Sequence, residues 1–408
     1  MHTEAGVPRL PAAGHSFDLS DPAAYAAGSA HAEWRRLRQT EPVRLEIAPS
    51  GVPYWSFFSY RDCESILKDT ATFSSASGTI LASIGVPDPA GGRTLVLADP
   101  PDHTRMRRLA MHHLGPAAVR RRYETIRHGV SRLVKSLTLG EHDVMPTLRI
   151  LPMIAIGPMT GLPEKDWESM VFHATGCIAP DDPAFTRGGT DETLLYAHSR
   201  LFHMIDAALR DGGANADGSL AAGLRSLAIG DRPMGRRDVM LNFYSTLIGG
   251  NTTTPHVAAH LLLRLAEQPE LWEQVLDEPA LVPALVEEGV RWTTPTHSLV
   301  RRVTSDVEIG GTRLHAGDWV SAWVASANRD ESVFAAPYEF DPRRSPNPHL
   351  GFGRGAHFCI GTWAARSVLG ALIEGLAERG LRFRLAGEPQ HLKSNAINGI
   401  TSMPMRFF

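Results

Sequence analysis

The chain has 408 residues, 43% of them hydrophobic and 21% charged, with a formal net charge of −3. This length allows a large buried core, and the near-neutral charge gives no electrostatic reason for binding nucleic acid. The three cysteines, Cys63, Cys177 and Cys359, are far apart and form no C-x-x-C pair, which disfavours disulfides and structural zinc. We find neither a signal-peptide pattern nor 18 consecutive apolar residues, and we therefore expect a cytoplasmic protein without a membrane span.

Short strands are predicted in three regions of the chain. Pro42 to Ser59 alternates apolar and polar residues around Pro49-Ser50-Gly51, which predicts a hairpin. Asp306 to Ile309 and Trp319 to Val324 flank glycines and predict further strands. A last hairpin is predicted between Leu381 and Phe407.

Helical periodicity dominates the rest of the chain. The patterns run from His103 to Leu137, from Asp238 to Leu265, from Pro279 to Trp292 and from Thr362 to Glu378. No Ser/Gly-rich linker, repeat or block of charge divides the chain. We therefore predict that residues 1–408 form a single domain that is mainly α-helical with a small β component.

The helical pattern from Asp238 to Leu265 contains an unusual run of poor helix formers. The run is Gly249-Gly250-Asn251-Thr252-Thr253-Thr254. Paired glycines allow another group to approach the helix, and the Thr253 hydroxyl can bond back to the carbonyl of Gly249. Pro255 removes a donor, and its ring clashes with the carbonyl of Asn251. The alternative explanation is that small residues serve helix packing.

A glycine-rich loop surrounds the last cysteine, between His349 and Gly361. Gly351, Gly353 and Gly355 permit a tightly folded backbone, because glycine takes angles closed to other residues. Backbone amides and the start of the following helix favour the ionised thiolate of Cys359. The loop therefore predicts a sulfur ligand, the alternative being a buried apolar thiol.

The segment from Phe352 to Gly361 resembles the haem-binding signature of the cytochrome P450 family, Phe-Gly-x-Gly-x-His-x-Cys-x-Gly, at every defined position. The resemblance implies the cytochrome P450 fold, with a long helix over the haem and the cysteine-ligand loop beneath it. It implies haem b (iron protoporphyrin IX) as cofactor and Cys359 as the axial ligand of its iron, a thiolate that favours O–O cleavage. Phe352, Gly353 and Gly361 are the other cofactor-binding residues of this loop.

The same resemblance implies which residues contact the two haem propionates. They are His103 and Arg107, four apart on one helix face, together with Arg301 and His357. Arg302 is expected on the opposite face of its strand. For His357 to be the axial ligand in place of Cys359, the loop would have to be reversed. Three further residues, Glu288, Arg291 and Arg344, match structural motifs of the family that hold the segment before the cysteine loop.

The run of small residues resembles the oxygen-side motif of the family, Ala/Gly-Gly-x-Asp/Glu-Thr-Thr. The implied catalytic residues are Gly249, Gly250, Asn251, Thr252 and Thr253, with Thr253 as the oxygen-side threonine. Thr252 replaces the usual acid, and a hydroxyl can pass on a proton but cannot supply one near pH 7. Proton delivery is therefore expected to use ordered water or a substrate group, unless slower O–O cleavage is tolerated or the reaction is not a simple hydroxylation.

Alignment with the family assigns a substrate pocket that is mostly apolar with scattered neutral donors. Its residues are Ile80, Leu81, Ile84, Val86, Cys177, Ile178, Asn242, Thr246, His297, Ser298, Leu299, Ile397, Asn398 and Ile400. The absence of arginine and lysine from this set argues against a substrate anchored by a carboxylate. His297 can contact a polar substrate group or serve as a satisfied wall residue.

We therefore expect a monomeric bacterial haem-thiolate monooxygenase of secondary metabolism that inserts one atom of O2 into a small apolar or amphipathic substrate. Electrons are expected from NAD(P)H through ferredoxin or flavodoxin and a separate reductase, because the chain has no nucleotide loop and no cluster-binding cysteine set. The runner-up is an atypical P450 that closes a ring or forms a C–C or C–N bond. Further alternatives are a non-enzymatic haem sensor or electron carrier and, more distantly, a zinc hydrolase. Binding to nucleic acid or membrane is not expected.

Overall fold

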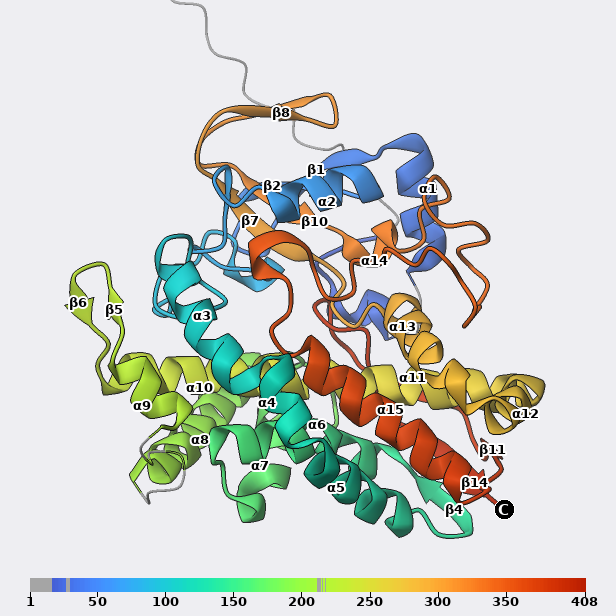
Figure 1. Ribbon diagram of the computed structural model, residues 1–408. Helices are drawn as coiled ribbons and strands as arrows, with labels where there is room; N and C mark the ends of the chain where they lie inside the picture. Colours follow the sequence, from blue (N-terminus) through green and yellow to red (C-terminus); the bar gives the residue numbers. More distant parts are fainter. Residues whose placement is uncertain (1–16, 27–29, 211–213, 215, 217) are drawn as a thin grey trace, which may run out of the picture.

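The computed structural model describes residues 17–26, 30–210, 214, 216 and 218–408. A helical part and a smaller β-rich part lie side by side; in Figure 1 the main sheet lies above most of the helices, with α1, α2 and α14 beside it. The strand order of this sheet is β1-β2-β10-β7-β3; β2 and β10 pair in parallel, and the other neighbours pair antiparallel. Its strands are β1 (Val43–Ile47), β2 (Pro53–Phe57), β3 (Phe73–Ser74), β7 (Leu299–Val303) and β10 (Trp319–Ala322).

The predicted hairpins are confirmed. Pro42 to Ser59 forms β1 and β2, and the C-terminal segment forms β11 paired with β14, which also pairs with β4. Smaller ladders join β5 to β6, β8 to β9 and β12 to β13. The bounds of these strands are β4 (Gly140–Asp143), β5 (Ala228–Ile229), β6 (Arg232–Pro233), β8 (Val307–Ile309), β9 (Thr312–Leu314), β11 (Phe383–Leu385), β12 (Gln390–His391), β13 (Ile400–Ser402) and β14 (Pro404–Phe407).

Helices form the larger part of the molecule. Their bounds are α1 (His31–Thr40), α2 (Tyr60–Lys68), α3 (Asp102–Leu114), α4 (Pro116–Arg121), α5 (Tyr123–Ser136), α6 (Met145–Thr160), α7 (Trp167–Gly176), α8 (Thr190–Arg210), α9 (Leu220–Arg225), α10 (Arg236–Asn251), α11 (Thr254–Glu267), α12 (Pro269–Asp277), α13 (Val282–Thr293), α14 (Val324–Ala327) and α15 (Thr362–Glu378). The predicted helix from Thr362 to Glu378 is therefore confirmed at both ends. Among the described helices, none is long and apolar enough to cross a membrane.

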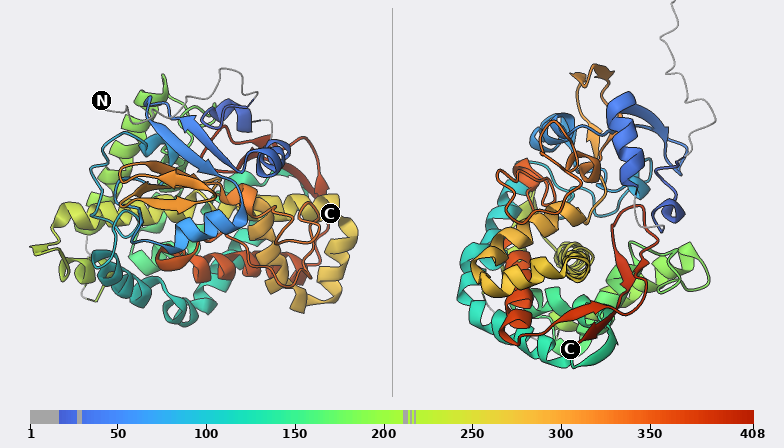
Figure 2. Two further views of the ribbon diagram at one scale, coloured as in Figure 1. Left: turned by 90° about the horizontal axis from the view of Figure 1, so that it is seen from above. Right: turned by 90° about the vertical axis from the view of Figure 1, so that its right-hand side faces the viewer.

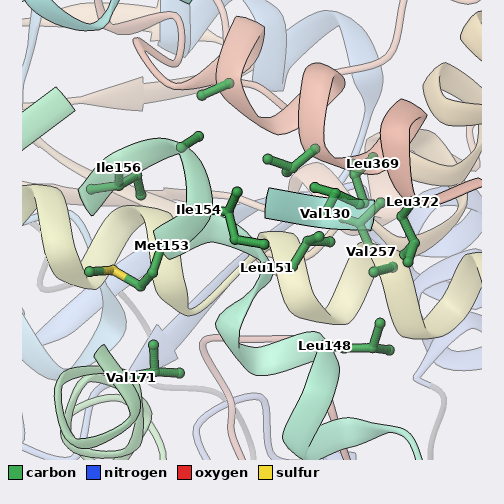
Figure 3. Packing of buried hydrophobic residues seen from close by; sticks show 14 of the residues in the cluster. Val130, Leu148, Leu151, Met153, Ile154, Ile156, Val171, Val257, Leu369 and Leu372 are labelled. Carbon is green, nitrogen blue, oxygen red and sulfur yellow. The ribbon is translucent and has the colours of Figure 1, made fainter. Parts of the chain in front are cut away.

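The largest hydrophobic core surrounds α6. Figure 3 shows Leu148 and Leu151 of α6 beside Val257 of α11, with Leu369 and Leu372 of α15 nearby. In Figure 2, right, α10 and α11 are seen end-on in the middle of the helical part. This packing holds α10, α11 and α15 in place. The predicted oxygen-side residues lie in α10 and at its junction with α11, and Cys359 lies just before α15.

Two of the predicted long helices are wrong, because each is divided into shorter helices. The pattern from His103 to Leu137 is divided into α3, α4 and α5, because Gly115 is extended and Pro116 starts a new helix. The pattern from Asp238 to Leu265 is divided into α10 and α11 at Thr252 and Thr253. Pro255 lies in the first turn of α11, where its missing N–H has no helical partner to lose.

Candidate active site

The loop before α15 folds tightly around Cys359. Gly353 and Gly355 have φ values of 71° and 69°, in the left-handed region that favours glycine. A Cβ atom on Gly355 would lie 2.6 Å from the carbonyl oxygen of Leu67, so no larger residue fits there. The amide of Cys359 donates to the carbonyl of Phe352 across 2.9 Å. This backbone fixes the cysteine immediately before the first turn of α15.

The Cys359 thiol is both accessible to solvent and surrounded by protein. Its side chain is exposed, whereas desolvation by surrounding atoms raises its pKa, against the opposing effects of the Gly361 amide and the Arg107 charge. The two observations agree if the sulfur lies at the wall of an internal space. A Cβ atom on Gly361 would lie 3.7 Å from that sulfur. The thiol is therefore available to bind a group that enters this space.

Basic side chains from three distant segments gather near Cys359. The rings of His103 and His357 lie 4.1 Å apart between centroids. Burial lowers the pKa of His103 to about 4 and that of His357 to about 3, and the charge of Arg107 lowers both further. Arg301 also lowers the pKa of His357, and burial lowers its own pKa to about 10. Near pH 7 the cluster therefore contains two neutral imidazoles and two guanidinium cations.

Several polar atoms of this cluster are buried without a partner among the described residues. They are both ring nitrogens of His103, Nε2 of His357 and Nε of Arg301. A buried polar group left unpaired costs about 1–3 kcal/mol, so the fold leaves donors here that an anionic ligand satisfies. Two carboxylates of a flat cofactor match these donors, and Cys359 lies nearby as a ligand for its metal. The residues present therefore fit a haem.

The glycine pair of α10 has two different roles. Gly249 is exposed although its helix runs through the molecule, and a Cβ atom added there would meet nothing within 4 Å. A Cβ atom on Gly250 would instead collide with Ile156 of α6. Gly249 therefore faces open space, and Gly250 allows α10 and α6 to pack closely.

The three residues after the glycines also point in different directions. The Thr253 hydroxyl donates to the carbonyl of Gly249 at 3.0 Å, as predicted. Thr252 is 2% exposed, and its hydroxyl donates to the carbonyl of Ile248 at 2.7 Å. Asn251 is buried, and its amide donates to the carbonyl of Leu247 at 2.9 Å. Of the predicted catalytic residues, Gly249 and Thr253 are thus less enclosed than Asn251 and Thr252.

The predicted structural residues form a buried ion-pair network. The side chains of Glu288 and Arg291 are completely buried, and the two N···O distances between them are 2.6 and 2.8 Å. Nε of Arg344 lies 3.3 Å from both carboxylate oxygens of Glu288. Arg291 also donates to the carbonyls of Asn328 and Pro337. The network ties α13 to the segment that leads to the cysteine loop.

The residues assigned to the substrate pocket have several different surroundings. Ile80 and Val86 are exposed, whereas Leu81 and Ile84 pack in a cluster with Tyr25 and Trp34. Leu299 belongs to the sheet-side cluster, Ile178 and Ile397 pack together, and Ile400 and Cys177 join the main core. Ser298 is buried.

The polar pocket candidates mostly have partners within the protein. Asn242 donates to the carbonyl of Arg93 and accepts from the amide of Leu95, Thr246 donates to the carbonyl of Asn242, and Asn398 donates to the carbonyl of Thr293. His297 stacks on Tyr25 with 4.6 Å between ring centroids, and both of its ring nitrogens lack a partner among the described residues. The bonds of Asn242 and Asn398 tie separate elements together, and His297 is left as a pocket candidate with spare donor capacity among the described residues.

Two residues beside the site were missed by the sequence analysis. Ser245 lies four residues before Gly249, on the same face of α10, and the spacing alone could have found it. Asp99 stabilises the charged form of Arg301, and its carboxylate accepts from the amide of Ser75 at 3.0 Å. No sequence signal indicates that Asp99 lies near Arg301, because the two residues are brought together only by folding.

Comparison with known proteins settles the family. A family model described as Cytochrome P450 matches residues 216–379. The chain is 30% identical over 397 residues to linalool 8-monooxygenase of Pseudomonas putida, covering 95% of this chain and 97% of that protein. The chain belongs to the cytochrome P450 family. The predicted fold is confirmed as well. The structure of a Mycobacterium marinum cytochrome P450 in complex with pseudoionone matches this P450 with a TM-score of 0.88 and 27% sequence identity. The match covers 98% of this chain and 100% of that chain.

A further relative supports the enzyme class. The P450 is 32% identical over 374 residues to a methyl-branched lipid omega-hydroxylase of Mycobacterium bovis, covering 89% of this chain and 86% of that protein. The protein is therefore a haem monooxygenase that uses O2, with electrons that originate from NAD(P)H and arrive through redox partners. Within the described part of the chain, no three His, Cys, Asp or Glu side chains gather as a metal site.

Proposed function

We propose that this P450 hydroxylates a compact apolar molecule of the terpenoid or methyl-branched lipid class, in secondary metabolism. Two relatives are named for oxidation of linalool and of methyl-branched lipids, and one structural neighbour is in complex with pseudoionone. The mainly apolar character of the candidate pocket residues fits such substrates. No arginine or lysine belongs to that set, which fits a substrate without a carboxylate anchor.

The single observation that carries the haem chemistry of this proposal is the set of unpartnered donors near Cys359. In our assignment the Cys359 thiolate would hold the haem iron, and His103, Arg107, Arg301 and His357 would bind the two propionates. The arginines supply positive charge, and the neutral imidazoles each supply one N–H donor near pH 7. When bound, the haem supplies thiolate-supported activation of O2.

In α10, the open space at Gly249 would leave room for substrate and O2. The Thr253 hydroxyl, held by the carbonyl of Gly249, can turn to donate its proton toward the same space. The hydroxyl of Thr252 is held on the carbonyl of Ile248 and cannot supply a net proton. We assign the relay to Thr253 and ordered water, with the proton taken finally from solvent.

Electron transfer is assigned to a ferredoxin with its own reductase. Bacterial members of the family use such partners, and this sequence has no Gly-x-Gly-x-x-Gly nucleotide loop of its own. We further propose that residues 1–408 act as one domain and as a monomer. Flavodoxin is the other carrier to be tried in reconstitution.

The test begins with the reduced protein under carbon monoxide. The red-shifted Soret band of thiolate-ligated haem is expected, together with its loss in Cys359→Ala, whereas a band typical of histidine ligation would contradict the ligand assignment. The ferric protein is then titrated with terpene alcohols and methyl-branched fatty alcohols, which carry no carboxylate, and products are identified after turnover. Hydroxylated products support the proposal, while ring closure or C–C or C–N coupling would replace it with oxidative coupling.

A further inference from the structure

A second cavity lies between α7, α8 and the loop that joins them. Its volume is about 180 Å³, and its walls include Phe172 and His173 of α7, Phe185 and Arg187 of the loop, and Tyr196 of α8. Figure 1 shows α7 and α8 below α10, away from the main sheet. None of the residues that line this cavity belongs to the active site described above. The cavity therefore needs an explanation of its own.

The loop over the cavity is held by its own hydrogen bonds. Asp182 is 3% exposed, and its carboxylate accepts from the amides of Ala184 at 2.9 Å and Lys393 at 2.8 Å. The Thr193 hydroxyl accepts from the amide of Arg187 at 2.8 Å and donates to the carbonyl of Gly189 at 2.7 Å. The cavity is thus formed before any ligand arrives, which lowers the entropic cost of binding.

Aromatic rings cover the walls of the cavity and remain partly in contact with water. The rings of Phe172 and Phe185 lie 5.3 Å apart, and those of His173 and Tyr196 lie 5.4 Å apart. Phe172 is 44% exposed and Tyr196 is 39% exposed, large fractions for apolar rings beside a cavity. A flat aromatic molecule can cover these faces and gain stacking contacts.

The charge around the cavity favours an anion. The guanidinium of Arg187 lies 4.4 Å from the centre of the Tyr196 ring, at the cavity wall. The pKa of His173 is lowered mainly by burial and then by the charge of Arg200. A second cation is therefore close to the cavity, and the imidazole of His173 is neutral near pH 7. The Glu192 carboxylate opposes these cations and lies 3.7 Å from the guanidinium of Arg187, beyond a good hydrogen bond.

We propose that this cavity is a second ligand site, separate from the haem, for a small aromatic carboxylate. The aromatic body stacks between Phe172 and Tyr196, and the carboxylate pairs with Arg187 in place of Glu192. This site does not depend on the proposed substrate, because its residues and its ligand charge differ from those of the active site.

Isothermal titration of the holoenzyme with 2-naphthoate tests the site. Saturable binding is expected without a shift of the Soret band. Arg187→Gln is expected to weaken binding of 2-naphthoate by about threefold, the size typical of an exposed ion pair, and to leave binding of the neutral 2-naphthalenemethanol unchanged. Arg313→Gln removes a similarly exposed guanidinium from the β8–β9 hairpin and serves as the matched control.

A second variant tests the cavity itself. Ala184 is exposed at the rim, so Ala184→Phe adds a ring without a buried clash and is expected to weaken 2-naphthoate binding at least about tenfold by filling the space. Absence of binding to the unmodified enzyme overturns the proposal. Unchanged affinity in Ala184→Phe, or binding that shifts the Soret band, places the acid elsewhere and also overturns it. Product analysis, which tests the proposed hydroxylation, is independent of these results.

Discussion

The hydroxyl of Thr253 donates a 3.0 Å hydrogen bond to the carbonyl of Gly249, across the interruption between α10 and α11. The carbonyl of Gly249 thereby gains a side-chain partner where the backbone ladder of α10 ends, and the hydroxyl stays near the open space that Gly249 faces. The break therefore places a proton-bearing group next to the position assigned to O2.

Removing this hydroxyl is expected to uncouple turnover. In Thr253→Val the shape is kept but no proton can be held, so coupled product formation is expected to fall by about a hundredfold or more, because one acid–base group typically contributes about 10²–10⁴-fold. Peroxide released per NAD(P)H consumed is the measurement. Thr253→Ser retains a hydroxyl and is expected to stay close to the unmodified enzyme; equal uncoupling in both variants would contradict a role for the proton.

Restoring an acid at Thr252 is expected to improve proton supply. If hydroxylation is the native reaction and proton supply limits it, Thr252→Asp raises coupled turnover and reduces peroxide release, because a carboxylate can titrate. Thr252→Asn, of similar size but unable to titrate, is the control. A shift of products toward hydroxylation would instead indicate that the native reaction closes a ring or forms a C–C or C–N bond. Unaltered rate, coupling and products in Thr252→Asp would place position 252 outside the proton path.

Haem retention is expected to depend on the buried face of β7. Arg301 is buried and Arg302 is exposed on the other face, as the alternation along a strand predicts. Truncating one member of a buried charged pair costs about 2–5 kcal/mol, so Arg301→Ala and Arg107→Ala are expected to lose haem on dialysis. Haem absorbance per protein is measured, with Arg302→Ala as the control. Full retention in both test variants would remove these residues from the cofactor site.

The ion pair of Glu288 and Arg291 is expected to be structural. Glu288→Gln leaves a buried guanidinium without its counter-charge, which costs about 3–5 kcal/mol in the free energy of unfolding. Glu278→Gln breaks an exposed surface pair with Arg343 and is expected to change stability by less than about 1 kcal/mol. Urea unfolding followed by far-UV circular dichroism compares the two. Equal stability of both variants would argue against the buried network as a support for the cysteine loop.

Stability is expected to fall in mild acid because of buried histidines. Burial lowers the pKa of His256, His260 and His297 to about 3, below the value of about 6.5 in an unfolded chain. Their contribution is complete above pH 6.5 and is lost as the pH falls toward 3, because only the unfolded state then binds the proton. At pH 5.5 each contributes a loss of about 1.4 kcal/mol in the free energy of unfolding.

Urea unfolding at pH 7.5 and pH 5.5 measures this loss. His260→Gln is expected to reduce the pH dependence by one histidine's share, because the amide does not titrate. An identical pH dependence in His260→Gln and the unmodified protein would contradict the assignment.

Short-range chemistry made much of this protein predictable from its sequence. The hairpin from Pro42 to Ser59, the helix from Thr362 to Glu378 and the bond from Thr253 to Gly249 depend on residues close together in the chain. The spacing around Cys359 likewise indicated a ligand loop and the P450 family, because its glycines and its cysteine lie within one segment. Local sterics and hydrogen bonds are enough to determine such features.

Long-range packing decided the rest. The contact between the rings of His103 and His357, the complete burial of Glu288 and Arg291, and the split orientation of Gly249 and Gly250 depend on elements far apart in sequence. The substrate-pocket residues were assigned by family alignment, yet tertiary packing gave Asn242 partners in a distant loop. Burial and desolvation are properties of the assembled interior, so the ionisation of a side chain and the side of a helix that faces open space are set only when the chain has folded.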